Sequence, residues 1–181
     1  MKQILLSCSV FALLIISGCK KADNPNNETE HEAVNRVELI FKSGSTVVAT
    51  YIAEDPDGDG GNPPSRIDKI NLLAGSSYTV EVVLKNVSNS VVKDISQSIR
   101  DQGKEHEFYF LPSGINVTIT KTDKDANGYP LGFNSTWAAG TSKSTGKVQL
   151  KLMHKPRIKG AADDPSKGHS DLTIDFPAEI Q

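Results

Sequence analysis

Apolar residues recur at every second position through most of the chain after Val34. The longest such segments lie at 37–41, 78–84, 115–119, 148–152 and 172–180. Because successive side chains of a β-strand point to opposite faces, each segment predicts a strand with one apolar and one polar face. A β-branched run at 46–52 and short runs at 70–72, 108–110 and 133–137 predict further strands. Such strands must bury their apolar faces against one another.

One segment between these strands has helical features. Asp94 followed by Gln97 has the pattern of a capping box. Val92, Ile95 and Ile99 would lie on one face of the helix that it begins. Eight or so strands separated by turn signals, with this single short helix, predict an all-β fold. The expected architecture is an antiparallel, immunoglobulin-like β-sandwich.

The N-terminus has the features of an export signal. Lys2 precedes an apolar run from Ile4 to Ile16, which is shorter than the roughly 20 residues that span a bilayer. The four residues from Ile16 to Cys19 resemble the lipobox of bacterial lipoproteins. The resemblance implies cleavage before Cys19 and its acylation with fatty acids such as palmitate. The alternative is an ordinary secretory peptide in which the cysteine is incidental.

These features divide the chain into three parts. Residues 1–18 are the predicted lipoprotein signal peptide, 19–33 the lipidated cysteine with a polar, disordered tether, and 34–181 the β-sandwich domain. Cys8 leaves with the signal peptide, so the mature chain has no disulfide. A domain of about 150 residues is large enough to be held by its core alone.

Charge and the residue after the lipidated cysteine indicate the surroundings of the domain. The formal net charge is −2, and no basic surface of the kind that binds nucleic acid is apparent. Lys20 follows Cys19, which by resemblance to lipoprotein sorting rules implies the outer membrane. We therefore expect a lipid anchor in that membrane, with the domain facing the periplasm or the cell surface.

Two loops carry acidic residues at alternate positions. Both follow the pattern D-x-D-x-[DN]-G, which in calcium loops arranges oxygen ligands around one cation. The candidate ligands are Asp55, Asp57, Asp59, Asp123, Asp125 and Asn127. Arg66 and Asn134 stand where an EF-hand has its bidentate Glu, so neither loop is an EF-hand. The alternative interpretation is that these residues simply favour hairpin turns.

The histidines form a second set of candidate ligands. His106 alternates with Phe108, so it should share the inward face. His154 alternates with Leu152, so it should point inward or lie at the rim of the sandwich, and the two strand ends could bring the histidines together. Neutral imidazole is the usual ligand for zinc or copper. We predict His106 and His154 as the pair, followed by His31 and then Glu105 as the carboxylate. The alternative is that each histidine is satisfied by a backbone carbonyl.

Signals for catalysis are poor. The sequence has no G-x-S-x-G elbow, no H-E-x-x-H motif, no phosphate-binding loop and no cysteine nucleophile in the mature chain. The aromatic residues around 108–110 and 129–137 suit either a binding groove or the core, and core is the more frequent role. We therefore predict a protein that is not an enzyme.

Several stretches together resemble a known family. They are His31-Glu32, Asp55 to Gly60, His106 to Phe110, Asp123 to Gly132, and Leu152 to Pro156. In this order they are similar to a group of small outer-membrane lipoproteins of Bacteroidota, often labelled as the type 1 periplasmic binding fold superfamily. Some members are encoded beside TonB-dependent receptors. The resemblance implies an accessory binding role in nutrient or metal uptake, with such a receptor as partner.

Two functions are expected from these observations. The first is a lipid-anchored, non-enzymatic binding module that captures a transition metal or metal chelate for an uptake receptor. The second is a structural or protein-interaction lipoprotein whose Asp-rich loops are stabilised by calcium. Convergence of His106 and His154 on one point would favour the first. Scattered histidines would favour the second.

Overall fold

The computed structural model describes residues 34–57, 61–88, 91–162 and 164–181. The predicted signal peptide, Cys19, His31 and Asp59 lie outside the described residues. The described residues belong to one compact unit. Within the described residues, no helix is long and apolar enough to cross a membrane.

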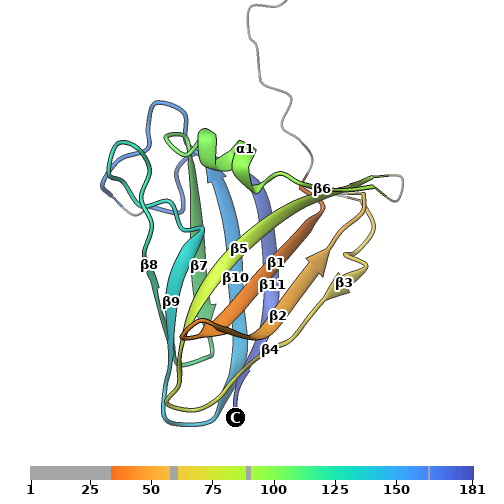
Figure 1. The fold of residues 1–181 in the computed structure, drawn as a ribbon, viewed down its shortest axis with the longest axis vertical. Helices are drawn as coiled ribbons and strands as arrows, with labels where there is room; N and C mark the ends of the chain where they lie inside the picture. Colours follow the sequence, from red (N-terminus) through yellow and green to blue (C-terminus); the bar gives the residue numbers. More distant parts are fainter. Residues whose placement is uncertain (1–33, 58–60, 89–90, 163) are drawn as a thin grey trace, which may run out of the picture. The chain divides into compact units, whose positions relative to one another are not determined.

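The domain consists of two β-sheets and one short helix (Figure 1). The elements are β1 (Arg36–Ser43), β2 (Thr46–Glu54), β3 (Arg66–Ile67), β4 (Ile70–Leu72), β5 (Ser77–Ser88), β6 (Val91–Asp94), α1 (Ser96–Asp101), β7 (His106–Ser113), β8 (Val117–Lys121), β9 (Asn134–Ala139), β10 (Ser144–His154) and β11 (His169–Ile180). One sheet has the order β3-β2-β1-β5-β9-β8, with β6 also paired to β5. The other sheet has the order β4-β11-β10-β7.

The strand order is that of an immunoglobulin-like sandwich. Strands β1-β5-β9-β8 follow the order A-B-E-D, and β7-β10-β11 follow C-F-G. Among the strands of the described residues, all pairs are antiparallel except β4 with β11, which is parallel. The predicted fold class is therefore confirmed. Strands β2 and β3 extend the first sheet beyond this common order.

The inward faces of the two sheets form one core, as the alternation predicts. Val37, Leu39 and Leu150 are fully buried, and the core continues through the aromatic residues. Trp137 contacts Phe41 edge to face, with ring centroids 5.1 Å apart. Trp137, Phe108, Phe110 and Phe133 belong to this core, and Tyr109 is buried on the other face of its strand, so these residues line no open groove.

The helix prediction holds in part. Helix α1 is present, but Gln97 bonds Asp101 and closes no capping box. Asp94 instead accepts a hydrogen bond from Ser96 N at 2.8 Å. Val92, predicted on the helix face, lies in β6 and is exposed. The prediction was wrong there because pairing with β5 keeps the chain extended up to Asp94.

Candidate metal site

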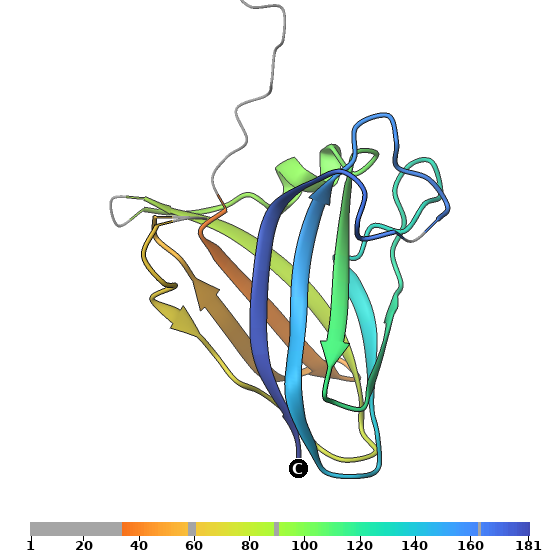
Figure 2. The same ribbon diagram turned by 180° about the vertical axis from the view of Figure 1, so that it is seen from behind.

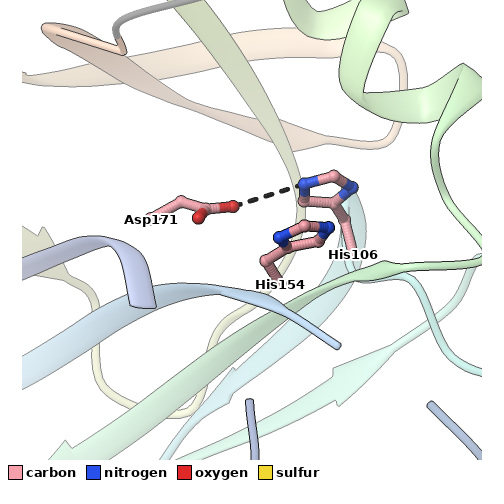
Figure 3. A group of neighbouring side chains, drawn as sticks. All are labelled: His106, His154 and Asp171. Carbon is pink, nitrogen blue, oxygen red and sulfur yellow. Dashed lines mark ion pairs between the residues drawn. The ribbon is translucent and has the colours of Figure 1, made fainter. Parts of the chain in front are cut away.

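Strand β7 begins with a histidine, and strand β10 ends with one. His106 and His154 lie directly opposite each other in the β7–β10 pairing. Their imidazole rings stack with centroids 4.7 Å apart and planes 11° apart (Figure 3). The two strands are antiparallel, so the start of one meets the end of the other. The structure thus brings together the two histidines that the sequence nominated as a pair.

The end of α1 orients the ring of His106. This residue is 0% exposed, and its Nδ1 lies 3.1 Å from the carbonyl oxygen of Gln102. Because a carbonyl oxygen can only accept a hydrogen bond, Nδ1 must carry the proton. The neutral ring then presents its lone pair at Nε2. In metal-ligating histidines, the ring nitrogen that does not bind the metal usually donates a hydrogen bond to a group such as a backbone carbonyl.

Asp171 approaches the same point from β11. Its Oδ2 lies 3.3 Å from Nε2 of His106, as Figure 3 shows. This oxygen is buried and accepts no hydrogen bond from the described residues. In the neutral tautomer of His106, a lone pair and a carboxylate oxygen therefore face each other. Such an arrangement is stabilised by a cation between the two atoms, either a proton or a metal ion.

A β-bulge places Asp171 on this face. Leu172, Ile174 and Phe176 point toward the core, so regular alternation would turn Asp171 to the opposite face. In the β10–β11 pairing, however, Leu152 is opposite Leu172, whereas Met153 is opposite Ser170. Asp171 is the extra residue of the bulge. Bulges redirect side chains, and here the redirected carboxylate points at the histidines.

The three residues form the one group within the described residues with the spacing of metal ligands. One ligand atom from each of His106, His154 and Asp171 lies within 4.8 Å of the other two. Zinc bonds of about 2.0–2.1 Å in a tetrahedron separate ligand atoms by about 3.3–3.4 Å. The separation between His106 and Asp171 already has this value. The remaining separations are no more than 4.8 Å, and because the two rings are stacked, the ring of His154 would rotate to turn a nitrogen toward the same ion.

The other predicted ligands lie nearby or elsewhere. Glu105 Oε2 is 3.6 Å from Nε2 of His154, and the Glu105 side chain is about half exposed. His169 is opposite His154 on β11 but is exposed, and it is not among the three clustered residues. Glu107 points to the other face of the sheet. The structure therefore adds Asp171 to the predicted histidine pair and places Glu105 beside His154. His31 lies outside the described residues.

Glu107 instead belongs to a buried polar cluster behind the site. Its Oε1 is 2.7 Å from Lys121 Nζ, and its Oε2 is 3.2 Å from Lys155 Nζ. Tyr109 donates a hydrogen bond to the same carboxylate at 2.6 Å, and Lys155 also donates to the carbonyl of Asp164. These bonds hold the β10–β11 loop against β7. Since His154 precedes this loop and Asp171 follows it, the cluster fixes the positions of both ligands.

The second Asp-rich loop is tied to the same end of the domain by an ion pair. Asp125 Oδ2 is 2.9 Å from Lys159 Nζ, and both side chains are almost fully buried. Burial alone would raise the pKa of the Asp125 carboxyl. The Lys159 ammonium and the N–H groups of Tyr129 and Asn127 outweigh this effect and hold the pKa below its ordinary value. Asp123 accepts a hydrogen bond from Gly132 N.

The first Asp-rich loop is described only in part. Asp57 Oδ2 accepts hydrogen bonds from the backbone and side-chain nitrogens of Asn62, at 2.8 and 2.7 Å. Both bonds lower the pKa of the Asp57 carboxyl, and the bond from the backbone nitrogen has the larger effect. Asp57, Asp123 and Asp125 thus serve as acceptors for N–H groups of their own loops. The calcium prediction for these residues stays a prediction.

Figures 1 and 2 show α1 and the loops at 122–133 and 155–168 gathered at one end of the sandwich, opposite the C-terminus. The three clustered residues lie at this end, at the start of β7, the end of β10 and the start of β11. Comparison of the chain with protein-family models, with curated proteins and with solved structures finds no match. The site must therefore be interpreted from its own geometry.

Proposed function

We propose that this protein is a lipid-anchored, non-enzymatic binding module that takes up a divalent transition metal, zinc or copper, through His106, His154 and Asp171. The observation that carries the proposal is that ligand atoms of two imidazoles and one carboxylate lie within 4.8 Å of one another. Two nitrogen ligands and one oxygen ligand suit zinc and copper better than calcium or magnesium, which prefer oxygen alone.

The surroundings of the site support reversible uptake. His106 is fully buried, whereas the side chains of His154 and Asp171 are about one fifth exposed. A metal held by three protein ligands keeps a fourth position for water or an incoming ligand. The carboxylate of Glu105, close to His154, can attract a cation from solvent before it reaches the buried ligands. Such an open site suits a carrier better than a closed structural site does.

The location in the fold also supports a binding role. The site borders the β5–β7 and β10–β11 connections, which correspond to two of the loops that form the binding end of antibody variable domains. This support is a fold-level analogy. With the predicted lipid on Cys19, the domain would work at the outer membrane, and a TonB-dependent receptor would be its partner. Val34, the first residue that the structure describes, lines the same pocket as Asp171.

Metal content tests the proposal directly. The chain from residue 20 onward is dialysed against a mixture of zinc, copper and calcium, and bound metals are counted by mass spectrometry. We expect about one zinc or copper ion per chain. The double variant His106→Ala/His154→Ala should lose it. His169→Ala is the matched control, because it removes an exposed histidine opposite His154 and should retain the metal.

Either of two results would overturn the proposal. The first is a chain that retains no transition metal after dialysis. The second is a double variant that binds as much zinc or copper as the parent chain, since the metal would then lie elsewhere. Circular dichroism of each variant shows whether the sandwich is intact, so that a loss of metal is not confused with a loss of fold.

A further inference from the structure

Strand β11 has one edge that is paired over only a short part of its length. On one side it pairs with β10 from His169 to Ile180, but on the other side β4 covers only Ala178 to Ile180. Within the described residues, no strand pairs with this edge from His169 to Pro177. Figure 2 shows the long β11 with the short β4 beside its C-terminal end alone. The edge of β11 from His169 to Pro177 is therefore open to a further strand.

The reason lies in the path of the chain just before β4. Residues Arg66 and Ile67 form β3, which pairs with β2 in the other sheet. The chain then crosses between the sheets and enters β4 at Ile70. A strand that ran alongside β11 over its whole length would need those residues. The crossing leaves its upper part without a neighbour.

A pocket of about 300 Å3 occupies the place of the missing strand. Its lining includes four consecutive residues of β11, Leu172 to Asp175, so the pocket faces the edge of that strand. Val37, Ala53 and Ile67 from the first sheet line the opposite side. Leu172 and Ile174 are only half buried, unlike Leu150 and Leu152 at the covered centre of the sheet. An added strand would complete their burial.

Backbone groups at this edge point into the pocket region. The N–H of Gln181 donates to Leu72 O at 2.9 Å, and its carbonyl accepts from Ala74 N at 3.1 Å. Both groups of Gln181 thus face the β4 side. Since these directions alternate along a strand, the N–H and C=O groups of Asp175 and Thr173 face the same side. Pro177, which has no N–H to offer, stands at the boundary with β4, where edge strands tolerate proline.

The charge around the pocket selects its occupant. Four acidic residues line it, Glu54, Asp55, Asp171 and Asp175. Among the described lining residues Arg36 is the one cation, and it pairs with Glu38 at 2.9 Å and Glu54 at 3.4 Å. Asp175 also pairs with Lys147 at 2.6 Å, so acidic groups still outnumber the cations at this edge. A second copy of the acidic β11 edge would be repelled. The chain's own tether carries Glu28, Glu30 and Glu32 and fits no better. Basic side chains are complementary to this edge.

We propose that the β11 edge between Asp171 and Pro177 binds an extended, basic peptide segment of a protein partner by strand addition. The peptide backbone pairs with Thr173 and Asp175. Its apolar side chains enter the pocket against Val37, Ala53 and Ile174, and its lysine or arginine side chains meet the acidic rim. Six residues of an extended chain span about 20 Å, close to the length of this edge.

Binding of three capped hexapeptides tests the proposal. They alternate valine with lysine, valine with glutamate, and valine with glutamine, and they are titrated into the zinc-free chain from residue 20 onward. We expect the lysine peptide to bind at least about tenfold more tightly than the glutamate peptide. It should also shift the amide resonances of Thr173 and Asp175. If none of the peptides binds at millimolar concentration, or if the glutamate peptide binds best, the proposal is wrong.

Variants separate backbone pairing from other contacts. Thr173→Pro removes one edge N–H and should weaken binding at least about tenfold, whereas Thr173→Val keeps the N–H and should bind as the parent chain does. Asp175→Lys should also weaken binding, with Asp101→Lys on α1 as the control for added charge. Equal binding by Thr173→Pro and Thr173→Val would overturn strand addition. Zinc content of each variant is measured in parallel, so a failure here is distinguishable from a failure of the metal site.

Discussion

Nε2 of His106 on β7 lies 3.3 Å from Oδ2 of Asp171 on β11, although β7 and β11 are not neighbours in the sheet. Strand β10, which carries His154, runs between them. The carbonyl of Gln102 holds the Nδ1 proton of His106, so the atom that meets the carboxylate is the one able to ligate a metal. The relationship therefore explains both why the cluster favours a cation and which atoms would bind it.

Asp171→Asn should weaken metal binding while leaving the apo fold intact. The amide can donate a hydrogen bond to Nε2 of His106, which stabilises the metal-free site, but it removes the anionic ligand. We expect zinc affinity to fall at least about tenfold, since even loss of an outer-shell partner costs 10–100-fold. Competition with a zinc-binding dye measures the affinity. Asp175→Asn, on the same strand but outside the cluster, is the control, and an equal loss there would contradict this assignment.

Zinc should stabilise the folded domain. A ligand that binds only the native state contributes about 2.7 kcal/mol when present at 100 times its Kd. For a domain of this size, that free energy corresponds to a rise in Tm of roughly 5–11 °C. The rise should disappear in His106→Ala/His154→Ala. It should also shrink in acidic buffer, because zinc binds the unprotonated imidazoles. A rise that is the same in parent and double variant would place the stabilising metal at another site.

Alternation allowed much of this structure to be predicted from the sequence. His106 and His154 each continue an apolar alternation, which predicts the inward face for His106 and the inward face or the rim for His154, and antiparallel pairing could bring them together. Asp171 could not be found in this way. Leu172 begins the alternation of the last strand, which assigns Asp171 to the other face, and the local sequence carries no mark of the bulge that reverses it.

The loops and the short strands show a second limit. The residue pattern around Asp125 is the same for a calcium loop and for a hydrogen-bonded turn, and the partner that distinguishes them, Lys159, is distant in sequence. The division of residues 66–72 between the two sheets depends on long-range pairing with β2 and β11. Such pairings are decided by the whole fold, so a local pattern cannot specify them.

Gly168→Ala should disturb the metal site, because Gly168 precedes β11 and has φ of 95°. A Cβ atom there would collide with the carbonyl oxygen of His154. Gly128 also has a positive φ, 82°, but a Cβ atom would meet nothing within 4 Å. Gly128→Ala should therefore cost only the backbone strain, about 1–2 kcal/mol. Gly168→Ala should cost more and also lower zinc affinity.

Urea unfolding and zinc titration of both glycine variants check this prediction. The difference between their free energies of unfolding reports the collision with His154, since both variants share the backbone strain. Equal stabilities with unchanged zinc affinity would show that the β10–β11 loop moves away without affecting the ligands.

The buried pair of Asp125 and Lys159 should make the domain sensitive to acid. Asp125→Asn leaves the Lys159 ammonium buried with its bond to the carbonyl of Gly103 but without its carboxylate. Loss of one partner of such a pair costs about 3–5 kcal/mol at neutral pH. The double variant Asp125→Asn/Lys159→Met removes both charges and should recover most of this loss.

The pH dependence follows from the direction of the pKa shift of Asp125. Its pKa in the folded state lies below the ordinary value of 3.8, so the unfolded chain takes up the proton first as the pH falls. The stabilisation from this carboxylate is therefore complete well above pH 3.8, and it is lost as the pH falls through the lowered folded pKa. Urea unfolding at pH 7, pH 4 and pH 3 should show a steeper loss of stability in the parent chain than in the double variant. Parallel pH profiles would mean that Asp125 is not held ionised by Lys159 in the folded domain.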